Sequence, residues 1–252
     1  MPENLSTPIP VSHWEKAPDA PDVRPLELHL WCGRTAVSDA LVMDLASSLP
    51  EEERGRAARL RRPDARRHYV AGRTLLRRVL GAVLCVPPSG IRFAYSAAGK
   101  PSLSSPANDT LRFSLSHAGD MILVALAHGM DVGVDVERVR GVPAAERIAL
   151  RMFETPTLGV LRSLSAQDRV LAFLHAWTQR EAVVKAIGGR LFSTRDPLPF
   201  GWPRPPRALR VPAGDEESEW SVLTPSLGPA WVATAVALGG IERVRQWTMA
   251  IA

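Results

Sequence analysis

Apolar and polar residues alternate along the chain in patterns that predict two successive groups of strands and helices. Leucines alternate with polar or aromatic residues over 26–31, which predicts a strand. Residues 38–49 and 51–85 have helical patterns, and Pro63 is expected to divide the longer stretch into two helices. Further strands are predicted at residues 91–95, 111–116, 121–127 and 132–136.

The second half of the chain repeats this order. Residues 144–153 and 167–187 are predicted helices, and residues 221–223 and 231–238 are predicted strands. The stretch 194–219 is dense in proline, arginine and acidic residues, which is typical of a loop or an edge strand.

This order of elements predicts an α+β fold. We expect two tandem, similar α/β subdomains with a pseudo-twofold relation and an active-site cleft at their seam. The N-terminal subdomain is expected to span residues 26–130 and the C-terminal subdomain residues 131–252, which would carry the metal motifs. Residues 1–25 contain six prolines and no periodic pattern, so we expect a flexible tail there.

Composition narrows the possible classes of protein. Of the 252 residues, 46% are apolar and 23% are charged, which is ordinary globular usage and excludes a wholly disordered or collagen-like chain. Two cysteines, Cys32 and Cys85, are too few for a disulfide scaffold. No apolar run reaches the roughly 18 residues of a membrane span. The first 25 residues have no secretory pattern, so we expect a cytoplasmic location.

The balance of charge indicates an anionic partner. The net charge is +5, which makes a polyanion plausible. Of the 31 lysine and arginine residues, the lysines are Lys16, Lys100 and Lys185. Because arginine is used almost everywhere else, the positions of these lysines are of interest. The arginine-rich helix keeps one alternative open, a basic nucleic-acid-binding protein without catalysis. No standard signature of such a protein is present, and the helix begins with Glu51–Glu53.

The segment GVDVE at 133–137 is a candidate metal site. Residues two apart in a strand share a face, so Asp135 and Glu137 would project together while the valines face the core. Two neighbouring carboxylates need a cation, and hard oxygen ligands favour Mg²⁺. A solvated strand end, with nearby arginines pairing the acids, is the structural alternative.

The segment WTQREAVVK at 177–185 is a second candidate. Trp177, Glu181 and Lys185 are spaced four apart and therefore share one helix face. An ordinary surface ion pair would be worth only about 0.3–0.5 kcal/mol. The indole on the same face indicates partial burial, where a carboxylate and an ammonium suit a metal and a phosphate.

Two further segments carry polar groups at strand ends or turns. In FSLSH at 113–117, Ser116 and His117 could hold a phosphate or could simply end a strand. Adjacent residues rarely act as a nucleophile and its base, and no G-x-S-x-G motif is present. The turn at 99–101 presents Lys100.

Together, these four motifs closely resemble those of the Sfp-type 4′-phosphopantetheinyl transferases. The motifs read GKP at 99–101, FSLSHA at 113–118, GVDVE at 133–137 and WTQREAVVKAIGGRL at 177–191. Their order and spacing match those of the family. The arginine-rich helix at 66–77 is also similar, with one residue of slippage, and the resemblance covers roughly residues 50–195 and the final strand.

The resemblance implies an enzyme, a holo-carrier-protein synthase. Members transfer the 4′-phosphopantetheine arm of coenzyme A to a serine of an apo acyl, peptidyl or polyketide carrier protein, with Mg²⁺, and release 3′,5′-ADP. A role in polyketide or nonribosomal peptide biosynthesis would follow. Because both halves of the cleft lie in one chain, we expect an active monomer. The function that the resemblance implies involves neither nucleic acid nor membrane, so we expect neither as a partner.

The resemblance also implies roles for individual residues. Asp135 and Glu181 would hold Mg²⁺, joined by Glu137 directly or through water. Glu181 would also be the general base, and Lys185 would neutralise charge on the pyrophosphate as the bridging bond breaks. The residues expected to bind coenzyme A are Arg67, Lys100, Ser116, His117, Arg180 and Lys185, with His68 as the alternative to Arg67.

The chain departs from the family pattern at three positions. Ala118 replaces a serine that could bind phosphate, and Arg180 stands where many members have lysine. Arg190 stands where the family has glycine in a G-x-G-L sequence, so Gly188 and Gly189 would have to supply the turn there.

Overall fold

The computed structural model describes residues 13–36, 38–188, 198–213 and 216–251. The helices are α1 Asp39–Ser47, α2 Glu51–Arg59, α3 Pro63–Leu84, α4 Ala145–Met152, α5 Thr155–Ser163 and α6 Ala166–Ile187, with a 3₁₀ turn at Pro88–Gly90. The strands are β1 Glu15–Lys16, β2 Glu27–Arg34, β3 Arg92–Tyr95, β4 Pro101–Ser105, β5 Leu111–Ala118, β6 Met121–His128, β7 Val132–Arg138, β8 Ala208–Ala213, β9 Glu216–Leu223, β10 Trp231–Leu238 and β11 Arg243–Thr248.

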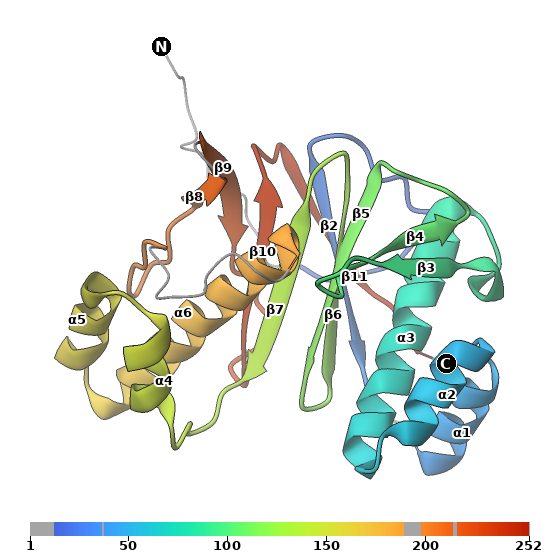
Figure 1. The fold of residues 1–252 in the computed structure, drawn as a ribbon, viewed down its shortest axis with the longest axis horizontal. Coiled ribbons are helices and arrows are strands. Elements are labelled where there is room, and N and C mark those ends of the chain that lie inside the picture. The colour runs from blue at the N-terminus through green and yellow to red at the C-terminus, as the bar shows by residue number, and fades with distance from the viewer. Residues whose placement is uncertain (1–12, 37, 189–197, 214–215, 252) are drawn as a thin grey trace.

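Two main sheets form the centre of the molecule, and each is covered by one long helix (Figure 1). The first sheet has the strand order β1-β11-β2-β6-β5, and the second has the order β7-β10-β9-β8. Strands β3 and β4 form a separate hairpin. Helices α3 and α6 are each 22 residues long. The prediction of an α+β fold with two tandem halves is therefore confirmed.

Three apolar layers hold these elements together. Residues such as Leu75 of α3 and Trp31 of β2 fill the core between α3 and the first sheet. Leu30 and Val134 belong to a core that the two sheets share, because it contains residues of β2, β6, β7 and β10. Val183 of α6 packs in a core on the outer face of the second sheet. The halves thus share a common interior and are one packed unit.

The N-terminal segment and the last strand correct the predicted division of the chain. Glu15–Lys16 pairs in parallel with Trp247–Thr248, and Val23 is buried in the core, so the described part of residues 1–25 is tied to the first sheet. Strand β11 pairs in parallel with β2, also in the first sheet. Residues 243–248 therefore do not belong to the C-terminal half, although they follow it in the sequence.

Several elements differ from their sequence-based expectation in extent. Pro63 does begin a new helix, and its position at the first turn explains why, since the missing N–H is not needed there. Helix α5 and strand β4 were not predicted, because T-P-T-L-G and P-S-L-S-S carry turn residues. The stretch 194–219 includes β8, the edge strand of the second sheet.

Of the described helices, none combines the length and the apolar character that crossing a membrane requires.

Candidate active site

The seam between the two sheets is built from the edge strands β5 and β7. Each is the last strand of its sheet, so its outer backbone groups have no neighbouring strand to pair with. Serines of β5 compensate: the hydroxyl of Ser114 accepts the N–H of Val134 at 3.2 Å, and that of Ser116 accepts the N–H of Val136 at 3.4 Å. Side chains thus replace backbone pairing at this seam.

A glycine brings helix α6 close to β7. A Cβ built on Gly133 would lie 1.8 Å from the carbonyl oxygen of Ala182 and 2.8 Å from the nitrogen of Ala186. Only glycine fits between this strand and this helix. Because Gly133 and Asp135 lie on the same face of β7, the close approach places Lys185 of α6 next to the Asp135 carboxylate.

Asp135 and Lys185 form a buried cluster with Ser116. The Lys185 Nζ lies 2.7 Å from Asp135 Oδ1, 2.8 Å from Ser116 Oγ and 3.2 Å from the Val134 carbonyl. Ser116 in turn donates to Asp135 Oδ1 at 2.8 Å. Every one of these contacts to Asp135 involves Oδ1. The buried Oδ2 has no hydrogen-bond partner in the part of the chain that the structure describes.

The pKa of the neighbouring Glu137 carboxyl is affected by its surroundings. Burial, and secondarily the negative charge of Asp135, raise the pKa of Glu137 above its usual range. Nearby positive charges and a hydrogen bond from Trp177 oppose the rise without cancelling it. Asp135 and Glu137 lie on one strand face, and the nearby positive charge does not fully offset the repulsion between their ionised forms.

Glu181 is paired with its own neighbour. Arg180 Nη1 donates to Glu181 Oε1 at 2.6 Å, and the Arg180 side chain is largely buried. Among the described residues, no group of three or more His, Cys, Asp or Glu side chains lies close enough together to hold a metal ion. The expected convergence of Asp135, Glu137 and Glu181 is therefore not seen, because Asp135 takes Lys185 as its counter-charge and Glu181 takes Arg180.

The donor set nevertheless fits a hard divalent cation. A buried carboxylate oxygen without a donor is costly unless it gains a proton or a cation. Asp135 Oδ2 is such an atom, and Glu137 is a second carboxylate whose ionised form lacks compensation. Glu181 lies on the face of α6 that carries Lys185. These three residues could hold the ion.

A pocket of about 360 Å³ lies beside this cluster. Its lining includes residues of α3, the turn after β3, strand β5 and the end of α6: Arg56, His68, Tyr69, Arg73, Leu76, Tyr95, Ala98, Gly99, Lys100, Pro101, Phe113, Ser114, Leu115, His117, Val184, Lys185 and Gly188. Four of these are arginine or lysine and none is acidic. An anionic ligand with an apolar or aromatic part fits this lining.

The structure distinguishes between the predicted residues of the pocket. His68 lines it, in edge contact with His117 at 5.3 Å between ring centroids. Arg67 is not among the lining residues, and it pairs with Asp39 at 2.5 Å. Burial, followed by the charges of His68 and Lys185, lowers the pKa of His117. The unprotonated imidazole is therefore favoured.

Lys100 and Arg180 lie at two other edges of the site. Lys100 lines the pocket, but its Nζ donates to Asp131 at 2.8 Å and to the carbonyl of Ala186 at the end of α6. Arg180 stands beside a separate small hollow with Phe200 and is not in the pocket lining. Ser116, as described, holds Asp135 and Lys185. Gly189 and Arg190 lie outside the described residues.

Sequence reasoning missed four contributors to this site. Ser114, Asp131 and Arg73 act through neighbours that are distant in the sequence, so no local pattern marks them. The spacing of Ser114 and Ser116 was a usable signal, since two serines two apart in a strand share one face. Gly133 was another, because a glycine within a strand often marks a close backbone approach.

Comparison with known proteins identifies the class. Residues 37–129 match a family model described as 4′-phosphopantetheinyl transferase, N-terminal, and residues 131–234 match the 4′-phosphopantetheinyl transferase superfamily. The boundary between the two matches falls in the short connection between β6 and β7.

Individual relatives agree with this. The 4′-phosphopantetheinyl transferase HetI of Nostoc is 36% identical over 163 residues, which cover 64% of this chain and 69% of HetI. A phosphopantetheinyl transferase of Thraustochytrium is 30% identical over 65% of this chain and 62% of its own. The 4′-phosphopantetheinyl transferase psf-1 of Bacillus pumilus is 29% identical over 71% of this chain and 75% of its own. The chain belongs to the 4′-phosphopantetheinyl transferase family and is an enzyme.

Proposed function

We propose that this enzyme transfers the 4′-phosphopantetheine arm of coenzyme A to a serine hydroxyl of an apo carrier protein and releases 3′,5′-ADP. The observation that carries the proposal is the cationic pocket, which has no acidic residue among its described lining and which Lys185, the partner of Asp135, helps to line. Coenzyme A carries a pyrophosphate, a 3′-phosphate and an adenine, so it matches such a pocket in charge and in aromatic content. The family membership supports the same substrate.

The pocket residues would divide the nucleotide between them. His117 and His68 provide ring nitrogens and Lys100 provides an ammonium for phosphate oxygens, whereas Tyr95 and Phe113 offer aromatic surface. The geometry favours His68 over Arg67 as the contact from α3, because Arg67 is engaged with Asp39. Ser116 contributes indirectly, by orienting Asp135 and Lys185.

Asp135 and Glu181, with Glu137 directly or through water, would hold a Mg²⁺ ion. When bound, this ion would neutralise negative charge that develops on the pyrophosphate during phosphoryl transfer. Asp135 Oδ2 is the ligand atom that the protein leaves without a partner. Arg180 pairs with Glu181 at 2.6 Å on the same helix.

Lys185 and Glu181 would serve the transfer itself. The serine oxygen forms a new bond to the phosphorus that carries the pantetheine arm, while the bond from that phosphorus to the bridging oxygen of 3′,5′-ADP breaks. Lys185 can neutralise the departing oxygen, since it is one of the residues that line the pocket. Glu181 would position the hydroxyl and accept its proton, either directly or through a water molecule.

The test is a mass measurement on carrier proteins. Purified enzyme is incubated with coenzyme A and Mg²⁺ and with a panel of apo acyl, peptidyl and polyketide carriers. We expect at least one carrier to gain the mass of phosphopantetheine at its serine, and 3′,5′-ADP to appear in equal amount. If no carrier is modified although the enzyme is folded and binds coenzyme A, the proposed reaction is wrong.

A further inference from the structure

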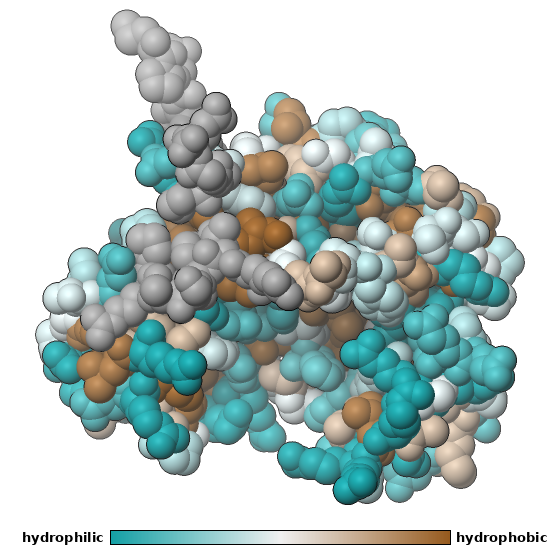
Figure 2. Space-filling model, in the orientation of Figure 1, coloured by the Kyte–Doolittle hydropathy of each residue, from teal (hydrophilic) through white to brown (hydrophobic). Residues whose placement is uncertain are grey.

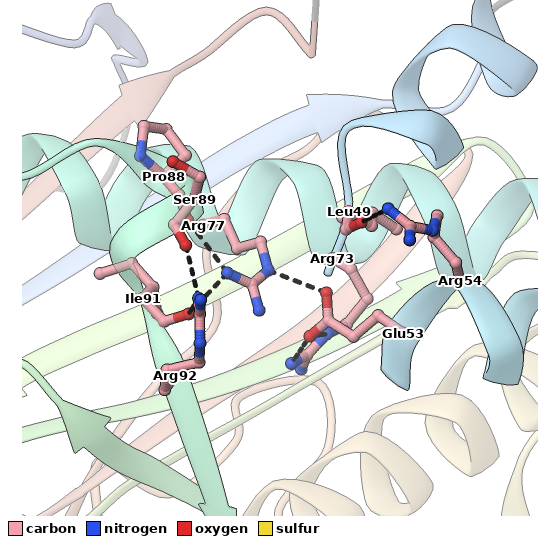
Figure 3. Close-up of polar contacts among 9 residues, drawn as sticks. All are labelled: Leu49, Glu53, Arg54, Arg73, Arg77, Pro88, Ser89, Ile91 and Arg92. Carbon is pink, nitrogen blue, oxygen red and sulfur yellow. Dashed lines mark hydrogen bonds and ion pairs between the residues drawn. The ribbon is translucent and has the colours of Figure 1, made fainter. Parts of the chain in front are cut away.

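A second buried carboxylate pairs with Arg73, one of the residues that line the pocket. Glu53 of α2 stands between two arginines of α3, Arg73 and Arg77, and Figure 3 shows its two oxygens pointing to different guanidinium groups. Arg73 Nε donates to Oε1 at 2.7 Å, and its Nη2 donates to the same oxygen. Arg77 Nε donates to Oε2 at 2.8 Å. All three side chains are almost completely buried.

The two arginines have different surroundings. Arg77 is fully used inside the protein, because its Nη1 also donates to the carbonyls of Pro88 and Ile91 at 3.0 and 2.8 Å (Figure 3). Arg73, by contrast, lines the cationic pocket. In the part of the chain that the structure describes, its Nη1 group has no hydrogen-bond partner.

The charges of this cluster do not balance. One carboxylate faces two guanidinium groups, which leaves one positive charge in a buried setting. Burial alone would raise the pKa of Glu53, but hydrogen bonds from Arg77 and Arg73 hold that pKa below its usual range. The remaining compensation comes from the face of Phe93, which lies 4.1 Å from the Arg73 guanidinium and 5.1 Å from that of Arg77.

An unbalanced buried cation beside a pocket needs an anion from the pocket. The Nε and Nη2 groups of Arg73 are fixed by Glu53 and its plane is fixed by Phe93, so its orientation is set before any ligand enters. A guanidinium held in this way loses little conformational entropy on binding a phosphate. Phe93 also contacts Phe113, which lines the pocket, at 5.7 Å between ring centroids.

We propose that Glu53 is a positioning residue for coenzyme A: its carboxylate holds Arg73 in the pocket wall, where the Nη1 group of the guanidinium binds an anionic group of the substrate. The proposal rests on the proposed function for the identity of the ligand. Arg77 has a structural role in the same cluster. It anchors the segment at Pro88–Ile91 and does not reach the pocket.

The experiment compares Glu53→Gln and Arg73→Gln with a control variant, Arg77→Gln. The control removes the second arginine that binds the Glu53 carboxylate. Steady-state transfer kinetics give KM for coenzyme A and kcat, calorimetry gives the dissociation constant of coenzyme A, and thermal unfolding gives stability. We expect Glu53→Gln and Arg73→Gln each to raise KM and the dissociation constant about tenfold with kcat nearly unchanged. Arg77→Gln should lower the melting temperature and leave both constants within twofold.

The double variant Glu53→Gln/Arg73→Gln tests whether Glu53 acts through Arg73. We expect its KM to equal that of Arg73→Gln alone, because the two changes remove the same contact. A folded Glu53→Gln enzyme with the wild-type KM would overturn the proposal, as would an Arg77→Gln enzyme that raises KM equally. If Glu53→Gln does not fold, an unchanged KM in Arg73→Gln overturns it. Wild-type protein that binds coenzyme A without transfer would contradict the proposed function alone, and wild-type protein that binds none would contradict both.

Discussion

Asp135 and Glu53 are both buried carboxylates beside the same pocket, and they are satisfied to different degrees. Glu53 uses both of its oxygens on arginines of the neighbouring helix. Asp135 uses only Oδ1, on Lys185 and Ser116, and leaves Oδ2 without a partner in the described part of the chain. Since an unpaired buried oxygen costs about 1–3 kcal/mol or more, this difference indicates two roles.

A saturated carboxylate fixes the shape of its surroundings, whereas an unsaturated one is prepared for a ligand. Around Glu53, the contacts tie α2, α3 and the segment before β3 together. Around Asp135, the seam between β5 and β7 is held by serine side chains in place of backbone pairs, and the cluster faces an open pocket. Figure 2 shows mostly hydrophilic side chains, with some hydrophobic ones between them, on the surface over α1–α3.

The largest effect is expected at the unsaturated carboxylate. Asp135→Asn keeps the shape and the contacts of the side chain but removes the charge that would hold Mg²⁺. We expect transfer to fall by at least about 10³-fold, because a bound ion supplies several kcal/mol of charge stabilisation. The measurement is the rate of carrier modification with thermal unfolding as a control. Near wild-type activity in a folded variant would show that Asp135 is not a ligand.

Glu181→Gln is expected to have the next largest effect. It preserves the size of the side chain and one potential ligand oxygen, but it removes the proposed proton acceptor and the counter-charge of Arg180. The transfer rate should fall by about 10²-fold or more, the usual loss when a general base is removed. Affinity for coenzyme A should stay within about tenfold, or 1.4 kcal/mol. An unchanged rate would mean that the serine proton leaves by another route.

Gly133→Ala tests whether the close approach of α6 to β7 builds the site. The added Cβ would lie 1.8 Å from a backbone oxygen, so strand and helix must separate. We expect a loss of about 3 kcal/mol or more in the free energy of unfolding, at the upper end of overpacking effects. The control is Gly159→Ala in α5, where a Cβ meets nothing within 4 Å. That change should stabilise the helix by up to about 1 kcal/mol.

The smallest effect is expected in a third buried cluster, away from the pocket. His29 Nε2 lies 3.0 Å from Glu27 Oε2, and Trp247 Nε1 donates to His29 Nδ1 at 3.3 Å. Burial lowers the pKa of His29, although Glu27 partly opposes this, while Arg245, Arg243 and Asp22 contribute the other nearby charges.

The sign of the pH effect follows from that direction. A histidine whose pKa is lower in the folded state than its unfolded value of about 6.5 is stabilising above that pH, and this stability is lost as the pH falls toward the folded pKa. Between about pH 6.5 and 5, wild type should therefore lose more stability than His29→Gln. The difference should be less than about 1.4 kcal/mol per pH unit, the limit for one proton. An equal loss of stability in wild type and in His29→Gln over this pH range would contradict the prediction.

The elements that sequence patterns predict well are those whose signal is local. Strand β7 shows its alternation, and α6 shows the spacing of Trp177, Glu181 and Lys185, so the polar motifs on them could be placed before the structure was known. Strand β11 escaped prediction, because its pairing with β2 joins residues more than 200 positions apart. The sequence could not decide whether Arg67 or His68 faces the pocket. Only the rotation of α3 against the pocket decides which of two adjacent residues faces it.

The most direct test of the contrast between the two carboxylates is a calorimetric titration of Mg²⁺ into enzyme saturated with coenzyme A. Wild type and Glu53→Gln, the latter saturated at higher coenzyme A concentration, should both bind about one ion per chain. Asp135→Asn should bind at least tenfold more weakly under the same conditions. If Asp135→Asn binds Mg²⁺ as well as wild type does, the unpartnered oxygen of Asp135 is not the metal ligand, and the central claim is contradicted.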